Sequence, residues 1–110
     1  MSCYMLVGYN DIKQRIKTLG EKLIPQGSHL LLYGSRARGD YNSNSDWDLL
    51  VLLNREHNSD DFDTISYPLM EMGFDMNQYF SVHTYTQKEW NQMSYLPFYK
   101  NVERDKIVLV

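Results

Sequence analysis

Residues 30–53 read LLLYGSRARGDYNSNSDWDLLVLL. This segment decides the fold, because an apolar run stands at each end and a polar loop lies between them. His29–Tyr33 has the composition of a buried strand, and Trp47–Leu53 is apolar almost without interruption, which predicts a strand covered on both faces of a sheet. We therefore expect two buried strands, joined by a small-residue turn, a short helical turn and a polar loop.

Two carboxylates stand at the start of the second strand. Because side chains alternate along a strand, Asp46 and Asp48 point the same way and Trp47 packs on the other side. Neighbouring carboxylates repel each other unless a cation holds them. Magnesium-like ions prefer oxygen ligands and tolerate phosphate partners, so the pair indicates a site for a metal and a nucleotide.

The turn after the first strand has the residues of a phosphate site. Gly34 allows the backbone to come close to a ligand, and Ser35 opens a helical turn whose free N–H groups and positive dipole end point outward. Arg36 and Arg38 follow in this turn. The sequence therefore places a candidate phosphate cradle opposite the carboxylate pair.

Three other interpretations fit part of this segment. The glycine spacing suits a P-loop, but Asp40-Tyr41 stands where that loop needs a lysine and a hydroxyl residue. The alternating polar residues from Asp40 suit an EF-hand, but Ser45 replaces its glycine and Val51 its final glutamate. The third interpretation is an ordinary surface loop of turn-forming residues. Taken singly, Gly-Ser or Asp-x-Asp is more often structural than functional.

The combination is more specific than its parts. Gly34-Ser35, a polar spacer and Asp46-x-Asp48, set between two apolar strands, resemble the signature of the DNA polymerase beta-like nucleotidyltransferase superfamily. The segment is most similar to the minimal nucleotidyltransferase (MNT) group, small proteins that often act as antitoxins beside HEPN-type toxins. The resemblance is sharp over residues 30–53, and the order of elements agrees over the rest. It implies an α/β (α+β) fold, with a small mixed sheet flanked by helices.

The resemblance also implies roles for these residues. Asp46 and Asp48 would be catalytic and would bind two Mg²⁺ ions between ATP and the attacking hydroxyl. Gly34 and Ser35 would hold the outer phosphates, and Arg36 and Arg38 would help to hold the departing pyrophosphate. For Arg38, an ordinary surface arginine is an equal alternative.

Members of this superfamily usually add a third carboxylate from a neighbouring strand. We expect the third strand over Phe74–Tyr85, whose only acid is Asp75. Counted back from Thr86, the expected position falls nearer Asn77 or Tyr79. Asp75 therefore serves after a shift of register, or the site is degenerate and catalyses weakly. His83 is an alternative proton acceptor, although a lone histidine on a strand is usually structural.

Other patterns predict the remaining elements. Asn10 or Asp11 caps a first helix that ends at residues 25–28, and Ser59 caps another helix that Pro68 bends or ends early. A capping box from Thr86 to Glu89 opens a third helix, and Pro97 starts a fourth. Ile107–Val110 docks as a strand or is covered by a partner. The residues predicted to be buried on the helices are Ile12, Ile16, Leu19, Leu23, Ile24, Phe62, Ile65, Leu69, Met72, Trp90 and Met93.

Composition limits the function. A chain of 110 residues forms a single domain, 1–110, so a large acceptor must come from a partner chain. The net charge of −3 and the absence of a basic run disfavour nucleic acid. The single cysteine, Cys3, is interpreted as incidental and fits a reducing compartment. With no signal peptide and no apolar run of membrane length, a soluble, cytoplasmic protein is expected.

The predicted function follows from the resemblance and the size. We expect a Mg-dependent nucleotidyltransferase that transfers AMP from ATP to a hydroxyl of a partner protein, such as a HEPN-type toxin. One alternative is a degenerate nucleotide-binding module that neutralises its partner by contact. Another is a small-molecule (antibiotic) nucleotidyltransferase. The sequence leaves open the acceptor, the preferred base and whether the chain forms a homo-oligomer.

Overall fold

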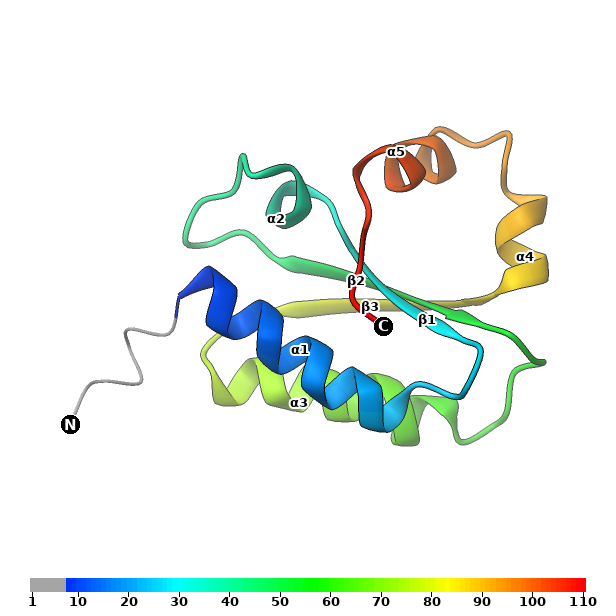
Figure 1. Ribbon diagram of the computed structural model, residues 1–110, viewed down its shortest axis with the longest axis horizontal. Helices are drawn as coiled ribbons and strands as arrows, with labels where there is room; N and C mark the ends of the chain where they lie inside the picture. The colour runs from blue at the N-terminus through cyan, green and yellow to red at the C-terminus, as the bar shows by residue number, and fades with distance from the viewer. Residues whose placement is uncertain (1–7) are drawn as a thin grey trace.

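The computed structural model describes residues 8–110, so Cys3 lies outside the described residues. A four-stranded sheet in the order β3-β2-β1-β4 lies between two layers of helices (Figure 1). β1 (His29–Tyr33) runs antiparallel to β2 (Trp47–Leu53) and to β4 (Ile107–Val108). β2 runs parallel to β3 (Phe80–Thr86), which is the outermost strand on its side. The sheet is therefore mixed, as expected.

One face of the sheet is covered by α1 (Tyr9–Leu23) and by the continuous pair η2 (Phe62–Ser66) and α3 (Tyr67–Asp75) (Figure 1). The buried core on this face consists of Ile12, Ile16, Ile24, Leu30, Leu32, Trp47, Leu49, Val51, Leu53, Ile65, Leu69, Phe80 and Leu109. The spacing of these residues along α1 and α3 is that of amphipathic helices on a sheet. None of the helices in residues 8–110 is both long and apolar enough to cross a membrane.

The other face is covered by α4 (Gln87–Gln92) and α5 (Pro97–Asp105) (Figure 1). Its smaller core consists of Leu31, Leu50, Leu52, Trp90 and Val102. Trp90 Nε1 donates a hydrogen bond of 2.9 Å to Glu103, which ties α4 to α5. Asp48 belongs to this face, because it alternates along β2 with residues buried on the other.

Local sequence signals predicted several elements correctly. The structure confirms both strands of the central pair, the short helix α2 (Ser35–Arg38), the start of α5 at Pro97 and the strand pairing of the C-terminal segment. It also confirms the capping box: Glu89 N–H donates to Thr86 Oγ1 at 3.0 Å, and Thr86 N–H donates to Glu89 Oε1 at 2.8 Å. Two predicted caps were wrong. α1 begins after Gly8 without a side-chain cap, and Ser59 does not cap the later helix, whose π turn follows Asp61.

The prediction of a strand from Phe74 was wrong. Phe74 and Asp75 are the last residues of α3, and β3 begins only at Phe80. The helix ends in a left-handed residue, Asn77 (φ 58°), while Gln78 N–H donates to the carbonyl of Gly73 at 2.8 Å. This is the Schellman arrangement that closes helices, with asparagine in place of the usual glycine.

Phe62 was predicted to be buried with Ile65 and Leu69, but its side chain is 56% exposed. The cause is the π turn of η2, in which Tyr67 N–H donates to the carbonyl of Phe62. In a regular helix the Pro68 ring would collide with the carbonyl four residues earlier, which belongs to this turn. The helix accommodates Pro68 by widening, and the extra residue turns Phe62 out of the core.

Arg36 is a buried structural residue, only 6% exposed. Its guanidinium donates to the carbonyl of Ser45 from Nε at 3.3 Å and from Nη2 at 3.0 Å. It also lies over two aromatic rings, 4.5 Å from the centroid of Tyr41 and 4.8 Å from that of Trp47. Tyr9 Oη donates to the backbone carbonyl of Arg36 at 2.6 Å. Arg36 therefore fastens the polar loop 39–46 to α1 and to the start of β2.

Replacing Arg36 with Met should lower the free energy of unfolding by about 1–3 kcal/mol, because the Ser45 carbonyl loses its donors and two cation–π contacts disappear. Urea unfolding measures the change. The matched control is Arg104→Met, since Arg104 is exposed and pairs only with neighbouring Asp105; its effect should stay within about 0.5 kcal/mol. Equal losses in the two variants would contradict the structural role of Arg36.

Candidate functional site

The site is built where the turn after β1 meets the start of β2. Tyr33 and Asp48 are register partners in the two antiparallel strands, so the next residue, Gly34, lies against the Asp48 side chain. Gly34 has a positive φ of 73°, and a Cβ atom placed there would collide with Oδ2 of Asp48. Only glycine allows this turn and this carboxylate to stand together.

Asp46 and Asp48 flank the fully buried Trp47, and Asp46 is near enough for its charge to act on Asp48. Asp46 is exposed and Asp48 is half-buried. Burial raises the pKa of Asp48 above its ordinary value, and the charge of Asp46 raises it further. The carboxylate pair is therefore electrostatically unfavourable by itself, which is the condition that a bound cation relieves.

The neighbouring strand β3 supplies the next two side chains of the site. Ser81 is the register partner of Asp48 across the parallel pair, and His83 is the partner of Leu50. Because register partners share a face, Ser81 and His83 lie on the same face as Asp48. Ser81 Oγ and His83 Nε2 are 3.4 Å apart, and the charge of His83 acts to lower the pKa of Asp48.

Asp75 is not brought together with this pair. It ends α3, which packs on the opposite face of the sheet from Asp48. Within residues 8–110, no group of three or more His, Cys, Asp or Glu residues is placed to hold a metal ion. The strand position beside Asp48 holds Ser81, a residue that the sequence analysis missed. Sequence reasoning expected the third carboxylate nearer Asn77 or Tyr79, both of which precede β3. The register of the parallel pair was the missing information.

The two arginines of α2 differ in what they contact. Arg36 is directed away from the carboxylates into the contacts with Ser45 and the aromatic rings. Arg38 is exposed and lies 3.3 Å from Asp40 and 3.3 Å from Asp105. Hydrogen bonds to these two carboxylates raise the pKa of Arg38, and its charge acts to lower the pKa of Asp48. Of the two arginines, Arg38 is therefore the one whose charge acts on the candidate site.

Tyr33 was also missed by sequence reasoning. It is partly buried beside Asp48, and burial, followed by the charge of Asp48, raises its pKa to about 12. The Tyr33 hydroxyl therefore stays neutral throughout the physiological range. Its ring meets Phe98 of α5 edge-on, with centroids 5.7 Å apart, so Tyr33 forms an apolar wall next to the carboxylates.

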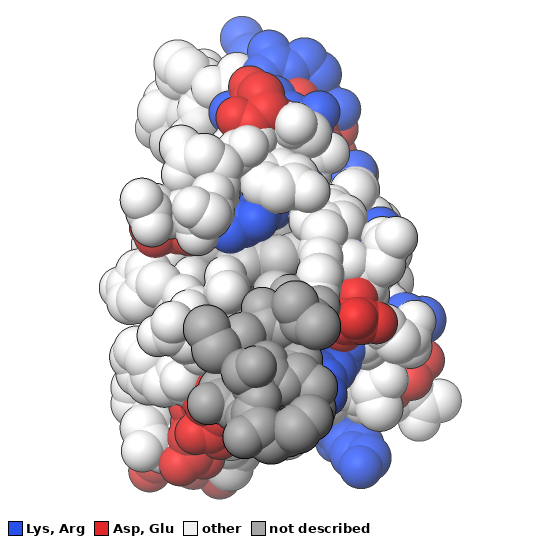
Figure 2. Space-filling model, turned by 90° about the vertical axis from the view of Figure 1, so that its left-hand side faces the viewer, with Lys and Arg blue, Asp and Glu red and all other residues white. Residues whose placement is uncertain are grey.

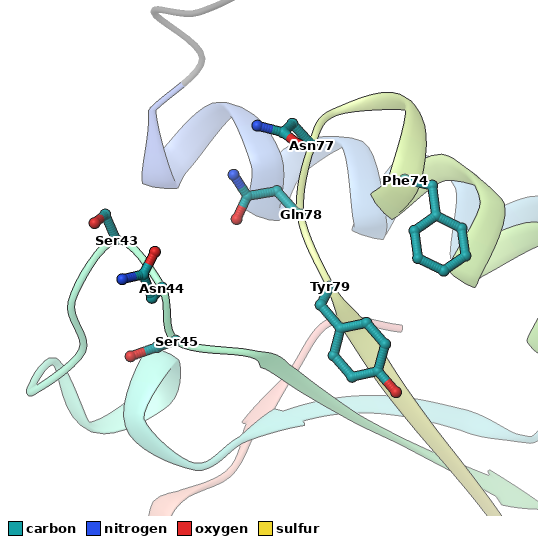
Figure 3. A pocket seen from close by; sticks show the side chains of 7 residues that line it. All are labelled: Ser43, Asn44, Ser45, Phe74, Asn77, Gln78 and Tyr79. Atoms are coloured by element: carbon teal, nitrogen blue, oxygen red, sulfur yellow. The ribbon is translucent and has the colours of Figure 1, made fainter.

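A pocket of about 310 Å³ opens where β2 and β3 begin (Figure 3). Its walls come from the polar loop before Asp46 and from the segment between α3 and β3. The lining residues are Ser43, Asn44, Ser45, Phe74, Asn77, Gln78 and Tyr79. The carbonyl of Tyr79 accepts the N–H of Trp47 at 2.9 Å, so the pocket adjoins the strand end that carries the carboxylates.

Comparisons with known proteins identify the family and the fold. Residues 10–109 match the family model described as a nucleotidyltransferase domain. A chain in a crystal structure of a toxin-antitoxin with AMP-PNP superposes with a TM-score of 0.61 at 17% identity, covering 89% of this chain and 72% of the other. A putative nucleotidyltransferase from Sulfolobus solfataricus superposes with a TM-score of 0.50 at 20% identity, covering 91% and 84%. No curated protein matches the chain. The mixed sheet flanked by helices is the nucleotidyltransferase fold, and the chain belongs to the nucleotidyltransferase-domain family.

Proposed function

We propose that this protein is a Mg²⁺-dependent nucleotidyltransferase that transfers AMP from ATP to a hydroxyl group of a partner protein. The observation that carries the proposal is the half-buried Asp48, paired with Asp46 and packed against the Gly34 turn. The family match supports nucleotide transfer as the chemistry. Since one structural neighbour is a toxin-antitoxin solved with AMP-PNP, we further propose that the partner is a toxin, of the HEPN type, and that the chain is its antitoxin.

The donor set suits magnesium. Asp46 and Asp48 offer hard carboxylate oxygens, and their mutual repulsion is relieved when a divalent cation lies between them. Mg²⁺ commonly binds through one or two carboxylates plus substrate phosphates and water, so two protein ligands are sufficient when the triphosphate supplies the others. When bound, two such ions neutralise charge on the entering and leaving oxygens of an in-line displacement.

The protein residues have separate tasks in this proposal. Gly34 leaves room for the triphosphate to approach the backbone, and Ser35 offers a hydroxyl at the start of α2. Arg38 balances the charge of the departing pyrophosphate. Tyr33 and the apolar residues behind it restrict water on one side of the carboxylates.

The proposed reaction is an in-line displacement at the α-phosphorus of ATP. The acceptor oxygen forms a bond to the α-phosphorus while the bond from that phosphorus to the bridging oxygen breaks. Pyrophosphate leaves with the electron pair, and the proton of the acceptor hydroxyl passes to Nε2 of His83. We propose His83 for this role because it lies on the carboxylate face of β3, where the residue beside Asp48 is Ser81 and not an acid.

A second candidate function is favoured by the absence of an acid on β3 beside Asp48. With Ser81 beside Asp48, the chain is alternatively a nucleotide-binding module that neutralises its partner by contact. The two candidate functions assume the same partner protein. They differ in whether a nucleotide is transferred to it.

Replacing Asp48 with Asn should weaken Mg-dependent ATP binding by at least about tenfold, or 1.4 kcal/mol, because a metal ligand is lost. Calorimetric titration with ATP in Mg²⁺ and in EDTA measures this change. Asp75→Asn is the matched control and should leave affinity unchanged, since Asp75 lies across the sheet. Tight Mg-ATP binding by the Asp48 variant would overturn the proposed site.

Without metal, the same Asp48→Asn substitution should stabilise the protein at pH 7. The native pKa of Asp48 is raised, so its ionised form weakens the folded state, and this penalty is absent in the amide. The stability advantage should shrink as pH falls and vanish below about 4, where the carboxyl is protonated in both folded and unfolded states. Thermal unfolding in EDTA across this pH range measures it. A variant less stable than the natural chain at pH 7 would contradict the prediction.

Transfer itself is tested with ATP labelled at the α-phosphate, Mg²⁺ and the product of the neighbouring gene. We expect label on the partner with the natural chain, none with Asp46→Ala, and a rate reduced about 10²-fold or more with His83→Ala. Lys88→Ala, a change at an exposed residue after β3, serves as control. A stable complex without label would favour neutralisation by contact.

A further inference from the structure

Four aromatic side chains on one part of the molecule are about half exposed. Phe62, Tyr67, Phe74 and Tyr79, which we call the aromatic stripe, are 56%, 48%, 58% and 52% exposed. They are four of the six large apolar side chains that are exposed in residues 8–110. Half-exposed aromatic side chains of this number present roughly 300–500 Å² of surface, which is the size of the functional patches found on monomers.

The first three rings form a line along η2 and α3, and Tyr79 adjoins Phe74 from the segment between α3 and β3. Phe62 and Tyr67 have ring centroids 6.3 Å apart, and Phe74 and Tyr79 have centroids 6.5 Å apart. Tyr67 and Phe74 are seven residues apart in α3, which is two helical turns and therefore the same side. The π turn brings Phe62 into this line, since an uninterrupted α-helix would direct it with Leu69 into the core.

The surface around the aromatic stripe is acidic. Residues 56–87 contain no lysine or arginine. The exposed acids on this segment of helix and its approach are Asp60, Asp63, Glu71 and Asp75. Asp61 is excluded from this set because it is buried and paired with Arg55 at 2.8 Å. By contrast, α1 carries Lys13, Arg15, Lys17 and Lys22 as well as Asp11 and Glu21. Figure 2 shows acidic side chains at the lower left of this end of the molecule, and basic side chains mixed with acidic ones at the lower right.

The aromatic stripe ends beside the candidate active site. Phe74 and Tyr79 line the pocket that also contains Ser45, the residue before Asp46 (Figure 3). Tyr79 leads directly into β3, whose outer edge has no strand partner among the described residues. A segment lying along the stripe therefore arrives at the strand ends that carry Asp46 and Ser81.

We propose that the aromatic stripe and its flanking acids dock a basic, amphipathic segment of the partner protein that accepts the nucleotide. The naming of that partner as the acceptor rests on the proposed function. Arginine and lysine side chains complement this surface in two ways. They form ion pairs with the carboxylates, and they make cation–π contacts with the faces of the Phe and Tyr rings. A second copy of the chain brings the same net charge of −3, so a partner of opposite charge is the better complement.

The test uses a synthetic helical peptide with leucines on one face and arginines on both flanks. We expect binding by fluorescence anisotropy that weakens with salt, and amide NMR shifts concentrated in residues 60–80. Phe74→Ser should weaken binding by about tenfold or more, and Asp63→Asn with Glu71→Gln should flatten the salt dependence. The same peptide with glutamate in place of arginine should not bind.

Tyr95→Ser is the matched control, because Tyr95 is 74% exposed but lies outside the stripe. Equal binding by the Phe74 and Tyr95 variants, or NMR shifts concentrated elsewhere, would overturn the proposal. Analytical sedimentation of the chain alone tests a second copy as the occupant. A dimer that Phe74→Ser abolishes would show that the aromatic stripe binds a second copy, and would reject the basic partner.

These measurements can reject the proposed docking surface and the proposed transferase activity independently of each other. Tyr67→Ser should weaken peptide binding and retain Mg-ATP affinity, since Tyr67 belongs to the aromatic stripe but does not line the pocket beside the candidate site. Peptide binding without any metal-dependent ATP binding would reject the transferase and keep the surface. Metal-dependent ATP binding without peptide binding that depends on the aromatic stripe would reject the docking surface and keep the nucleotide site.

Discussion

The structure depends on the contact between Gly34 and Asp48. The antiparallel pairing of β1 and β2 sets Tyr33 opposite Asp48, and the left-handed turn at Gly34 then returns the chain over that carboxylate. Any side chain at Gly34 would collide with it. The contact fixes the turn, the start of the short helix after it and the position of the Asp48 carboxylate. One steric requirement thus holds this carboxylate against the turn that opens α2.

This arrangement places a cost on the folded state, which the rest of the sheet offsets. Asp48 is partly buried beside a like charge, while its neighbours Trp47 and Leu49 are fully buried on the opposite face. The apolar face anchors β2 against α1 and α3 and prevents the repelling carboxylates from moving apart. Arg36 adds a second anchor by holding the loop before Asp46. Rigidity at the site therefore comes from the core on the far side of the sheet.

Sequence reasoning succeeded where an element depends on residues close in the chain, and it was wrong where the element depends on distant ones. β1, β2 and the capping box depend on neighbouring residues, and their patterns predicted them. Between residues 59 and 79 the outcome depends on a π turn that accommodates Pro68 and on a left-handed Asn77, so both Phe62 and the start of β3 were misplaced. The identity of the residue beside Asp48 depends on parallel register, which no local pattern encodes. That register brings in Ser81 and leaves Asp75 on the other face.

These two departures bear on whether the proposed cation site and the proposed docking surface could be occupied at the same time. The carboxylates of the site lie on the α4 and α5 face, whereas the acids beside the aromatic stripe lie on η2 and α3 beneath the other face. A divalent ion bound by Asp46 and Asp48 would neutralise charge locally, and salt would screen its influence beyond roughly 8–10 Å at the surface. The acids of α3 would therefore remain available to a basic partner in the presence of the ion. Because β3 borders both surfaces, a partner held by the proposed docking surface would lie next to the strand on which Ser81 and His83 share the face of Asp48.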